Sequence, residues 1–384
     1  MKRTPYTRTA LAVISGLGLL ALGGCEPGHK QTVQYGYRGT GMNQIIDVKH
    51  MVSPGTIPDA PYPLPADGGP KAGETYQNVK VLSGVSTERF NHLMAEISQW
   101  VAPPEQGCAY CHNPENMASD EKYTKVVARR MLQMTQTINS TWSPHVQKVG
   151  VTCYTCHRGN AVPANKWALS AGAPHPGSIL GDRHDQNPVS ADAAYSDLPT
   201  TGFADYLLGA KNIRVYGTTA LPKYDGKGAS VQTAEKSYGL MMHMSKALGV
   251  NCTFCHNTQA FGAWNLSRPQ RATAWYGIRM VRDINNTYIS SLQSVFPDNH
   301  DRKGPMGDPY KVNCTTCHQG VNKPLGGVSM MAQAPALWGP VAPYTAHAGA
   351  AAAEPAAAPA AAPADAAKPA PLAMNGAGPG TAAK

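Results

Sequence analysis

The chain has 384 residues, of which 42% are hydrophobic but only 7% aromatic, and its 38 glycines and 32 prolines indicate many turns and much irregular backbone. With so few bulky side chains, we expect something besides side chains to fill part of the interior. The formal net charge is +9, but the basic residues form no stripe interleaved with aromatic residues. The sequence therefore argues against nucleic-acid binding and favours a basic protein surface.

The N-terminus has the pattern of a secretion signal. A basic start is followed by an apolar stretch over residues 10–22, which is too short to span a bilayer comfortably. The stretch ends in Leu22-Gly23-Gly24-Cys25, which resembles the lipobox of bacterial lipoproteins; an ordinary signal peptide with a chance cysteine is the alternative. The resemblance implies that Cys25 becomes the N-terminus and carries lipid, whose acyl chains at ~0.8 kcal/mol per buried CH₂ would anchor the protein to the membrane.

Eight of the nine cysteines fall into four copies of Cys-x-x-Cys-His. The copies are Cys108-Ala-Tyr-Cys111-His112, Cys153-Tyr-Thr-Cys156-His157, Cys252-Thr-Phe-Cys255-His256 and Cys314-Thr-Thr-Cys317-His318. In such a motif the two thiols bond the vinyl groups of one haem, and the histidine is an axial ligand of its iron. Zinc sites and redox dithiols also use Cys-x-x-Cys, but neither needs a histidine after each of four pairs. The sequence therefore predicts four covalently bound c-type haems.

The four motifs form two pairs that look like copies of each other. Asn follows the first motif of each pair, and the second motif of each is preceded by Val and followed by x-Gly. Between the motifs of each pair lies a stretch with helical periodicity, and the texts over 134–142 and 280–288 echo each other. We therefore predict a mainly α multihaem cytochrome with much irregular backbone, built from two duplicated two-haem units.

The expected organisation follows from these patterns. It comprises a signal peptide over 1–24, an extended N-terminal segment over 25–85, the first two-haem unit over 86–166, a connecting segment over 167–230, the second two-haem unit over 231–328 and a C-terminal segment over 329–384. From about residue 346 the last segment is rich in Ala and Pro, and we predict a disordered tail there.

Each iron needs a second axial ligand, and the helix before each motif is the natural source. Met94 is the only plausible ligand on the helical face before the first motif; before the second and third the candidates are Met131 and Met134, then Met241, Met242 and Met244. Core packing is the commoner role of a methionine on an apolar stripe, but each haem must find a ligand. For the fourth haem the residues alone leave four candidates open, namely Met280, His145, His300 and Met306.

On these motifs, the chain closely resembles the tetrahaem cytochrome subunit of the photosynthetic reaction centre of purple bacteria. The resemblance covers roughly residues 25–328 and includes the lipobox, the haem motifs and long stretches such as 123–131, 150–159 and 277–283. It implies His/Met ligation of three haems, through Met94, Met131 and Met241. It further implies that the fourth haem has two histidines, His318 and His145.

The resemblance also implies a function. The chain would be an electron carrier, not an enzyme by itself, bound to the membrane subunits of the reaction centre at the periplasmic face of the photosynthetic membrane. It would re-reduce the photo-oxidised bacteriochlorophyll pair with electrons from a soluble c-type cytochrome or a high-potential iron–sulfur protein. Two alternatives are a multihaem oxidoreductase, which needs an iron with an open site, and a respiratory electron-carrier lipoprotein without a photosystem.

Charge near the first and third motifs suggests where electrons enter and leave. The segment 88–121 holds Glu88, Glu96, Glu105, Glu115, Asp120 and Glu121, opposed only by Arg89. Such a cluster predicts a dock for a positively charged donor, with a solvated helix face as the alternative. The resemblance places Arg271 near the exit toward the bacteriochlorophyll pair, where a cation would tune the potential of the haem at His256.

Overall fold

A computed structural model describes residues 30–36, 41–170, 190–196, 198–213, 231–298 and 301–345. All of these except residue 345 belong to one compact unit. The expected signal peptide, Cys25, His300 and the Ala/Pro-rich tail lie outside the described residues.

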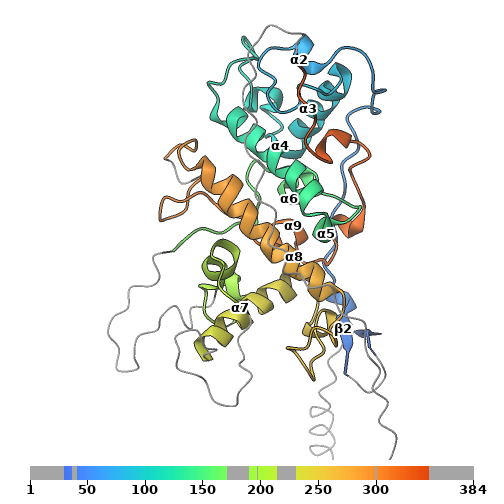
Figure 1. The fold of residues 1–384 in the computed structure, drawn as a ribbon, viewed down its shortest axis with the longest axis vertical. Coiled ribbons are helices and arrows are strands. Elements are labelled where there is room, and N and C mark those ends of the chain that lie inside the picture. The colour runs from blue at the N-terminus through green and yellow to red at the C-terminus, as the bar shows by residue number, and fades with distance from the viewer. Residues whose placement is uncertain are drawn as a thin grey trace, which may run out of the picture. The chain divides into compact units, whose positions relative to one another are not determined.

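The first half of the compact unit is built on two helices, α3 (Thr87–Val101) and α4 (Tyr123–Thr141). Their apolar residues recur every three or four positions, so Leu93 and Trp100 of α3 and Leu132 of α4 meet in one buried cluster. Residues 325–341, which lie mostly in the C-terminal segment, complete this cluster, chiefly through Met331 and Leu337. The end of the described chain therefore returns to the first half, beside α3 and α4 in Figure 1.

The second half is built on α7 (Val231–Leu248) and α8 (Gln270–Asp283). α8 continues without a break into a π-helix, η6 (Ile284–Ile289), and a short 3₁₀ turn, η7 (Ser290–Leu292). A second buried cluster joins both helices to the π-helix η4 (Phe203–Leu208) of the connecting segment. The connecting segment is thus partly a structural element of the second half.

The N-terminal segment holds more regular structure than its composition predicts. Strands β1 (Lys30–Gln34) and β2 (Asn43–Asp47) form an antiparallel pair in which Lys30 faces Asp47 and Gln34 faces Asn43. The remaining short elements are η1 (Val48–His50), α2 (Ala72–Thr75), η2 (Gly107–Tyr110), α5 (Ser143–Val146), α6 (Cys153–His157), η3 (Ala191–Ala193), η5 (Cys252–Phe254), α9 (Cys314–His318), η8 (Pro324–Gly327) and η9 (Pro335–Leu337). The fold is mainly helical with much irregular backbone, as the sequence predicts.

The long helices of the two halves contact each other. A third buried cluster contains Ile138 of α4 together with Met280 and Ile284 of the α8–η6 helix. At its edge the Thr137 and Tyr288 hydroxyls lie 2.6 Å apart, and Arg130 donates to the Thr287 carbonyl at 2.7 Å. The two halves therefore share a packed interface, visible where α4 and α8 approach in Figure 1.

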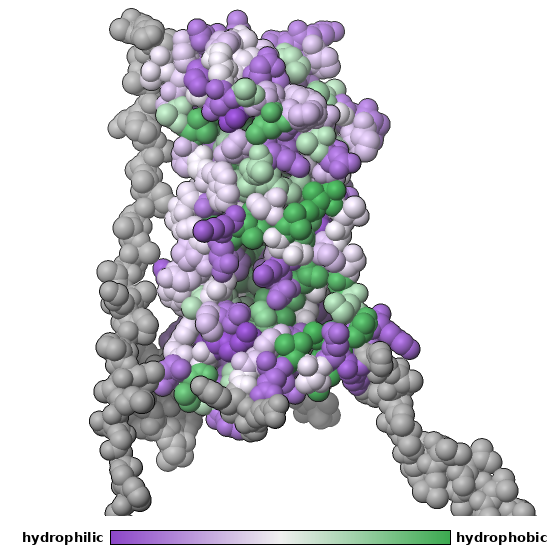
Figure 2. Space-filling view, turned by 90° about the vertical axis from the view of Figure 1, so that its right-hand side faces the viewer, coloured by the Kyte–Doolittle hydropathy of each residue, from purple (hydrophilic) through white to green (hydrophobic). Residues whose placement is uncertain are grey.

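The surface mixes polar and apolar residues. Figure 2 shows apolar side chains gathered in patches among polar ones on one face. Within the described ranges, no helix has both the length and the apolar character needed to cross a membrane.

Candidate haem-binding sites

A large cavity of about 1200 Å³ borders all four motifs. The cysteines and histidines of the first, second and fourth motifs line it, as does Cys255 of the third. Small-molecule sites usually measure about 300–1,000 Å³, so this space exceeds what one small ligand needs. An extended hollow bordered by Cys-x-x-Cys-His motifs and methionines fits large flat apolar groups such as haem.

The motifs adopt two conformations that alternate along the chain. The second and fourth are one-turn α-helices, α6 and α9, each begun by a capping box that Thr152 and Asn313 open. Each ends at a left-handed residue, Arg158 or Gln319, with a φ of 52° or 50°. The first and third motifs instead form the 3₁₀ turns η2 and η5.

All four motif histidines are oriented by the same kind of hydrogen bond. In each, Nδ1 lies within 3.2 Å of a backbone carbonyl oxygen, and the acceptors for His112, His157, His256 and His318 are Met117, Asn160, Phe261 and Val321. A carbonyl can only accept, so Nδ1 carries the proton and Nε2 keeps the lone pair that a metal requires. Burial also lowers the pKa of His318 to about 4, with a smaller contribution from His145, which favours the neutral ring.

His145 lies opposite His318. Their ring centroids are 6.0 Å apart, and His145 Nδ1 lies 2.9 Å from the carbonyl oxygen of Thr273 on α8. Two imidazoles that bind one iron through Nε2, with metal–nitrogen bonds of about 2 Å, also place their ring centres about 6 Å apart. The pair therefore has the spacing that an iron with two histidine ligands needs.

The methionines divide into those that line the cavity and those that do not. Met94 and Met131 line it, and so do Met134 and Met280, so the ligand roles of Met94 and Met131 stay predictions. Near the third motif, Met241 and Met244 both pack against the second buried cluster, but of the two only Met244 lines the cavity. The ligand role of Met241 stays a prediction. Among the candidates for the fourth haem, Met306 is 56% exposed.

Two asparagines that the sequence reasoning missed hold the second and fourth motifs in place. Asn139 of α4 accepts from the Val151 amide at 2.7 Å and donates to its carbonyl at 2.9 Å. Asn285 of η6 makes the same two bonds to Val312, at 2.9 and 3.0 Å. Both asparagines stand at the same place in the repeated texts 134–142 and 280–288, which was the available signal.

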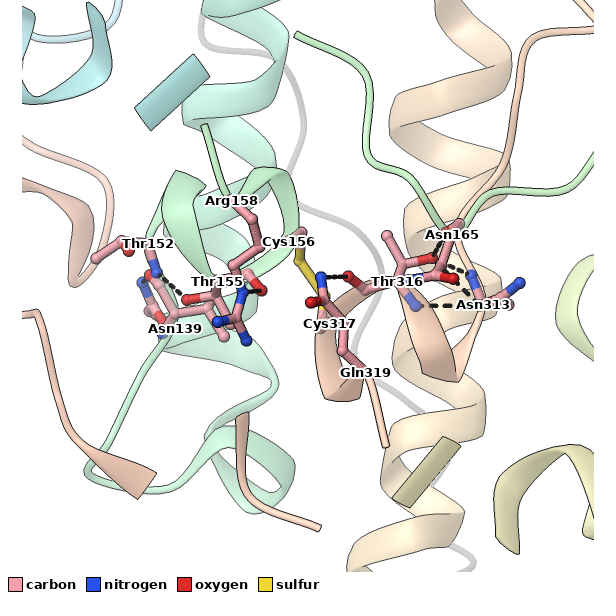
Figure 3. The surroundings of a disulfide bond; sticks show 11 residues. Asn139, Thr152, Thr155, Cys156, Arg158, Asn165, Asn313, Thr316, Cys317 and Gln319 are labelled. Carbon is pink, nitrogen blue, oxygen red and sulfur yellow. Dashed lines mark hydrogen bonds between the residues drawn. A yellow bond between two sulfur atoms is a disulfide. The ribbon is translucent and has the colours of Figure 1, made fainter. Parts of the chain in front are cut away.

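The second and fourth motifs meet through their second cysteines. The structure joins Cys156 of α6 to Cys317 of α9 in a disulfide, with a Cα–Cα separation of 4.3 Å (Figure 3). A sulfur atom in a disulfide cannot also form a thioether, so haem attachment at these two positions requires reduction of this bond. The predicted thioethers of Cys156 and Cys317 stay a prediction, while Cys108, Cys111, Cys153, Cys252, Cys255 and Cys314 are free thiols.

The acidic cluster near the first motif is weaker than predicted. Glu96 has no exposed surface and lies against His92, and burial raises the pKa of its carboxyl group to about 7. Asp120 is neutralised by Arg129 at 2.8 Å, with Lys80 and Lys125 each at 3.4 Å. The prediction that Glu96 contributes to a surface dock is therefore wrong, because helix α3 turns this side chain into the interior.

Basic and apolar residues surround the third motif. Arg271 stacks on Trp264 at 4.2 Å and contributes to the lowered pKa of His256, after burial. Arg268 donates to the Phe254 carbonyl at 3.1 Å and stacks on Tyr35, which ties the N-terminal hairpin to this motif. Arg271 thus lies close enough to His256 to affect its pKa, while its role in tuning a haem potential stays a prediction.

Comparison with known proteins bears on these sites. A family model described as the photosynthetic reaction centre cytochrome C subunit matches residues 26–338. The photosynthetic reaction center cytochrome c subunit of Rubrivivax gelatinosus is 48% identical over 331 residues, covering 86% of this chain and 88% of the relative. The corresponding subunit of Thermochromatium tepidum is 45% identical, covering 90% and 84%, and that of Roseobacter denitrificans is 38% identical, covering 85% and 90%.

Proposed function

Because the chain belongs to the family of photosynthetic reaction centre cytochrome c subunits, we propose that it carries four covalent c-type haems which pass electrons from a soluble periplasmic donor to the photo-oxidised bacteriochlorophyll pair. Family membership itself makes the chain a haem-containing electron carrier of photosynthesis that partners the reaction centre subunits. The number of haems, their ligands, the donor and the lipid anchor are the finer parts of the proposal.

The facing pair His145 and His318 carries the proposal. A haem held between two histidines has no open coordination site, so it exchanges electrons but binds no substrate. With Met94, Met131 and Met241 as the other distal ligands, all four irons are six-coordinate. Six-coordinate irons favour electron transfer over the alternative of a multihaem oxidoreductase. Family membership favours a photosynthetic electron carrier over a respiratory one.

The contacts between motifs support a spatial order for the haems. The first and second motifs lie in the half built on α3 and α4, and α3 packs against α6. The second and fourth meet at Cys156 and Cys317. The fourth lies in the same half as the third, where α9 packs against α7 and the Gly320 amide donates to the Ala247 carbonyl at 2.8 Å. We infer the order first, second, fourth, third.

The membrane-facing end of this row is the third motif. Its Asn251 and Thr253 side chains donate to the Asn43 carbonyl of β2 at 2.9 and 2.6 Å. Only five residue steps separate Cys25 from Lys30, the start of β1. A chain of that length spans about 17 Å at most, so lipid on Cys25 would hold the third motif close to the membrane. This end is therefore the proposed exit for electrons.

The donor end is the first motif. Cys108 is exposed, and Met117, whose carbonyl bonds to His112, is 52% exposed, so the haem attached there would have an accessible edge. Glu88, Glu105, Glu115 and Glu121 are exposed and supply negative charge, without the contribution first expected of Glu96. We propose that a donor with a basic face docks here.

We also propose that the two halves are duplicated two-haem units. Three features support this. Asn139 and Asn285 make the same pair of backbone bonds in the two halves, and 3₁₀ and α motifs alternate along the chain. The Gly159 amide bonds to the Trp100 carbonyl as the Gly320 amide bonds to the Ala247 carbonyl. Boundaries near 86–166 and 231–328 remain a proposal of the same kind.

The decisive experiment follows light-driven oxidation in membranes. With the chain present, a flash should oxidise the bacteriochlorophyll pair, which then regains its electron while a c-type haem becomes oxidised. Membranes from a strain that lacks this chain are the control, and they should re-reduce the pair more slowly. If haem oxidation after the flash is the same in both membranes, the proposed function is wrong.

A further inference from the structure

One matched position of the two long helices bears directly on ligand choice. Aligning the repeated texts pairs Met134 with Met280, a shift of 146 residues along the chain. The same shift pairs Met131, the proposed ligand of the second haem, with Gly277 on α8. The second half therefore has no side chain at the place where the first half has its methionine ligand.

His145 occupies the space that this missing side chain leaves. A Cβ atom built on Gly277 would lie 2.6 Å from Cε1 and 2.8 Å from Nδ1 of His145, far inside van der Waals contact. The ring is also bonded at 2.9 Å to the carbonyl of Thr273, which lies one helical turn before Gly277. Glycine at 277 thus opens a notch on α8 in which the imidazole reaches a backbone carbonyl.

A complementary exchange exists on the other side of the interface. The shift of 146 residues pairs His145 with Ser291 of η7. Ser291 accepts a hydrogen bond at 3.1 Å from Arg130, the residue before Met131. One site therefore combines a methionine on the long helix with a small residue across from it, whereas the other combines a glycine with a histidine.

We propose that Gly277 is a positioning residue that selects histidine over methionine as the distal ligand at the fourth motif. Its missing side chain admits His145, and the Thr273 carbonyl fixes the Nδ1–H tautomer so that Nε2 faces His318. This inference rests on the proposed four-haem function, since the iron would be that of the haem on Cys314 and Cys317.

The first test replaces Gly277 by alanine in the full-length, haem-loaded chain. The added Cβ should displace His145, so that one haem of the proposed four changes from low spin to high spin in the ferric electronic and paramagnetic resonance spectra. Gly239→Ala is the matched control, because its Cβ would lie 3.0 Å from the Pro199 carbonyl oxygen, away from His145. The control should keep the fourth haem low spin.

The sharper test rebuilds the arrangement of the second site at the fourth. His145→Ser alone should leave one haem high spin, whereas His145→Ser with Gly277→Met should restore low spin with methionine ligation. The restored haem should show the far-red charge-transfer band of ferric His/Met haem and a higher reduction potential than in the natural chain. The converse pair, Met131→Gly with Ser291→His, should give the second haem two histidine ligands.

The outcomes distinguish the role of Gly277 from the proposed ligation by His145 and from the proposed function. If both double variants keep the covalent haem content but neither acquires the exchanged ligand, or if Gly277→Ala keeps every haem low spin, the selecting role of Gly277 is wrong. If His145→Ser alone leaves all haems low spin, His145 is not a ligand and the proposed ligation itself fails. A covalent haem content other than four in the natural chain would contradict the proposed function.

Discussion

At the scale of single residues, buried hydrogen-bonding groups position the haem motifs. Asn285 has no exposed surface and bonds to both backbone groups of Val312, two residues before Cys314, and to the Leu207 carbonyl. Asn139 does the same for Val151 and adds a bond to the Leu337 carbonyl at 2.7 Å. One amide side chain thus joins a long helix, a haem motif and a more distant segment.

Replacing Asn285 by alanine should therefore destabilise the fold. Buried groups left without partners cost about 1–3 kcal/mol each, so we expect a loss of about 2–4 kcal/mol in the free energy of unfolding. Chemical denaturation followed by circular dichroism would measure it. Asn286→Ala is the matched control, since this neighbour is exposed and makes one bond, to the Leu208 carbonyl at 2.8 Å, worth about 1 kcal/mol. Equal losses of unfolding free energy in both variants would mean that Asn285 does not hold the fourth motif in place.

Asp120 gives a prediction about pH. Its hydrogen bond to Arg129, followed by the charges of Arg129 and Lys80, holds the pKa of its carboxyl group below the ordinary value of 3.8. A lowered pKa in the folded state stabilises the protein above pH 3.8 and loses that effect as the pH falls below it. Because the side chain is 34% exposed, we expect this effect to add only about 1 kcal/mol to the free energy of unfolding.

Asp120→Asn should accordingly lower the free energy of unfolding near pH 7 and make it less dependent on pH below about 4. Denaturant titrations at several pH values would show both effects. Glu121→Gln, at the exposed neighbouring position, is the control and should leave the profile close to that of the natural chain. If the profile of Asp120→Asn coincides with that of the natural chain, the Asp120 cluster does not contribute to stability.

At the scale of elements, the glutamates beside the turn of the first motif face solvent, whereas a glutamate of α3 faces the interior. Glu105 and Glu115 flank the motif and are exposed, whereas Glu96 on α3 is buried. Reversing Glu105 and Glu115 to lysine should slow reduction by a basic donor about tenfold at low salt, and less at high salt. Stopped-flow rates across ionic strengths would measure this, with Glu235→Lys on α7 as the control.

The same elements show how far sequence reasoning reaches. Periodic apolar residues predicted a helix between the two motifs of each pair, and the structure has α4 and the α8–η6–η7 run there. Periodicity did not show the inward direction of Glu96, because that depends on the packing of α3 against segments distant in the chain. The β1–β2 pair was missed too, since its polar strands lack an alternating apolar pattern.

At the scale of the whole molecule, the sites arise from segments far apart in sequence. Cys156 and Cys317 are 161 residues apart, and His145 bonds to Thr273 128 residues further on. Motif spacing predicts the haem cysteines and histidines but does not choose between Met280, His145, His300 and Met306 for the fourth haem. That choice depends on how α5 packs against α8, which no local pattern contains.

Haem attachment should consume all eight motif thiols. Mass spectrometry of the haem-loaded chain after alkylation should find four haem peptides, no alkylated cysteine among the eight and no peptide pair linked through Cys156 and Cys317. The same chain produced without haem and purified without reductant should contain that linked pair. A linked pair in the haem-loaded chain would show that the second and fourth haems are held by fewer thioethers.

The anchor can be tested in the absence of the reaction centre subunits. Cys25→Ser should yield a haem-loaded chain that washes off membranes, because the acyl chains on the thioether would be missing. The natural chain, expressed in the same strain, should remain membrane-bound. Retention of the variant in washed membranes would mean that an uncleaved signal or a protein contact holds it.

The exchange between Gly277 and His145 also bears on ancestry. A symmetric dimer of the first half would have a methionine at both matched positions, and a dimer of the second half would have neither the methionine nor the histidine. On the proposed ligation, the second half depends on His145 of the first half, whereas the first half contains every ligand proposed for its own irons. The first half depends in turn on Met331 and Leu337, which follow the second half in the chain and complete its buried cluster. Any split of the gene between the halves would break both dependences, which favours keeping the two halves in a single polypeptide.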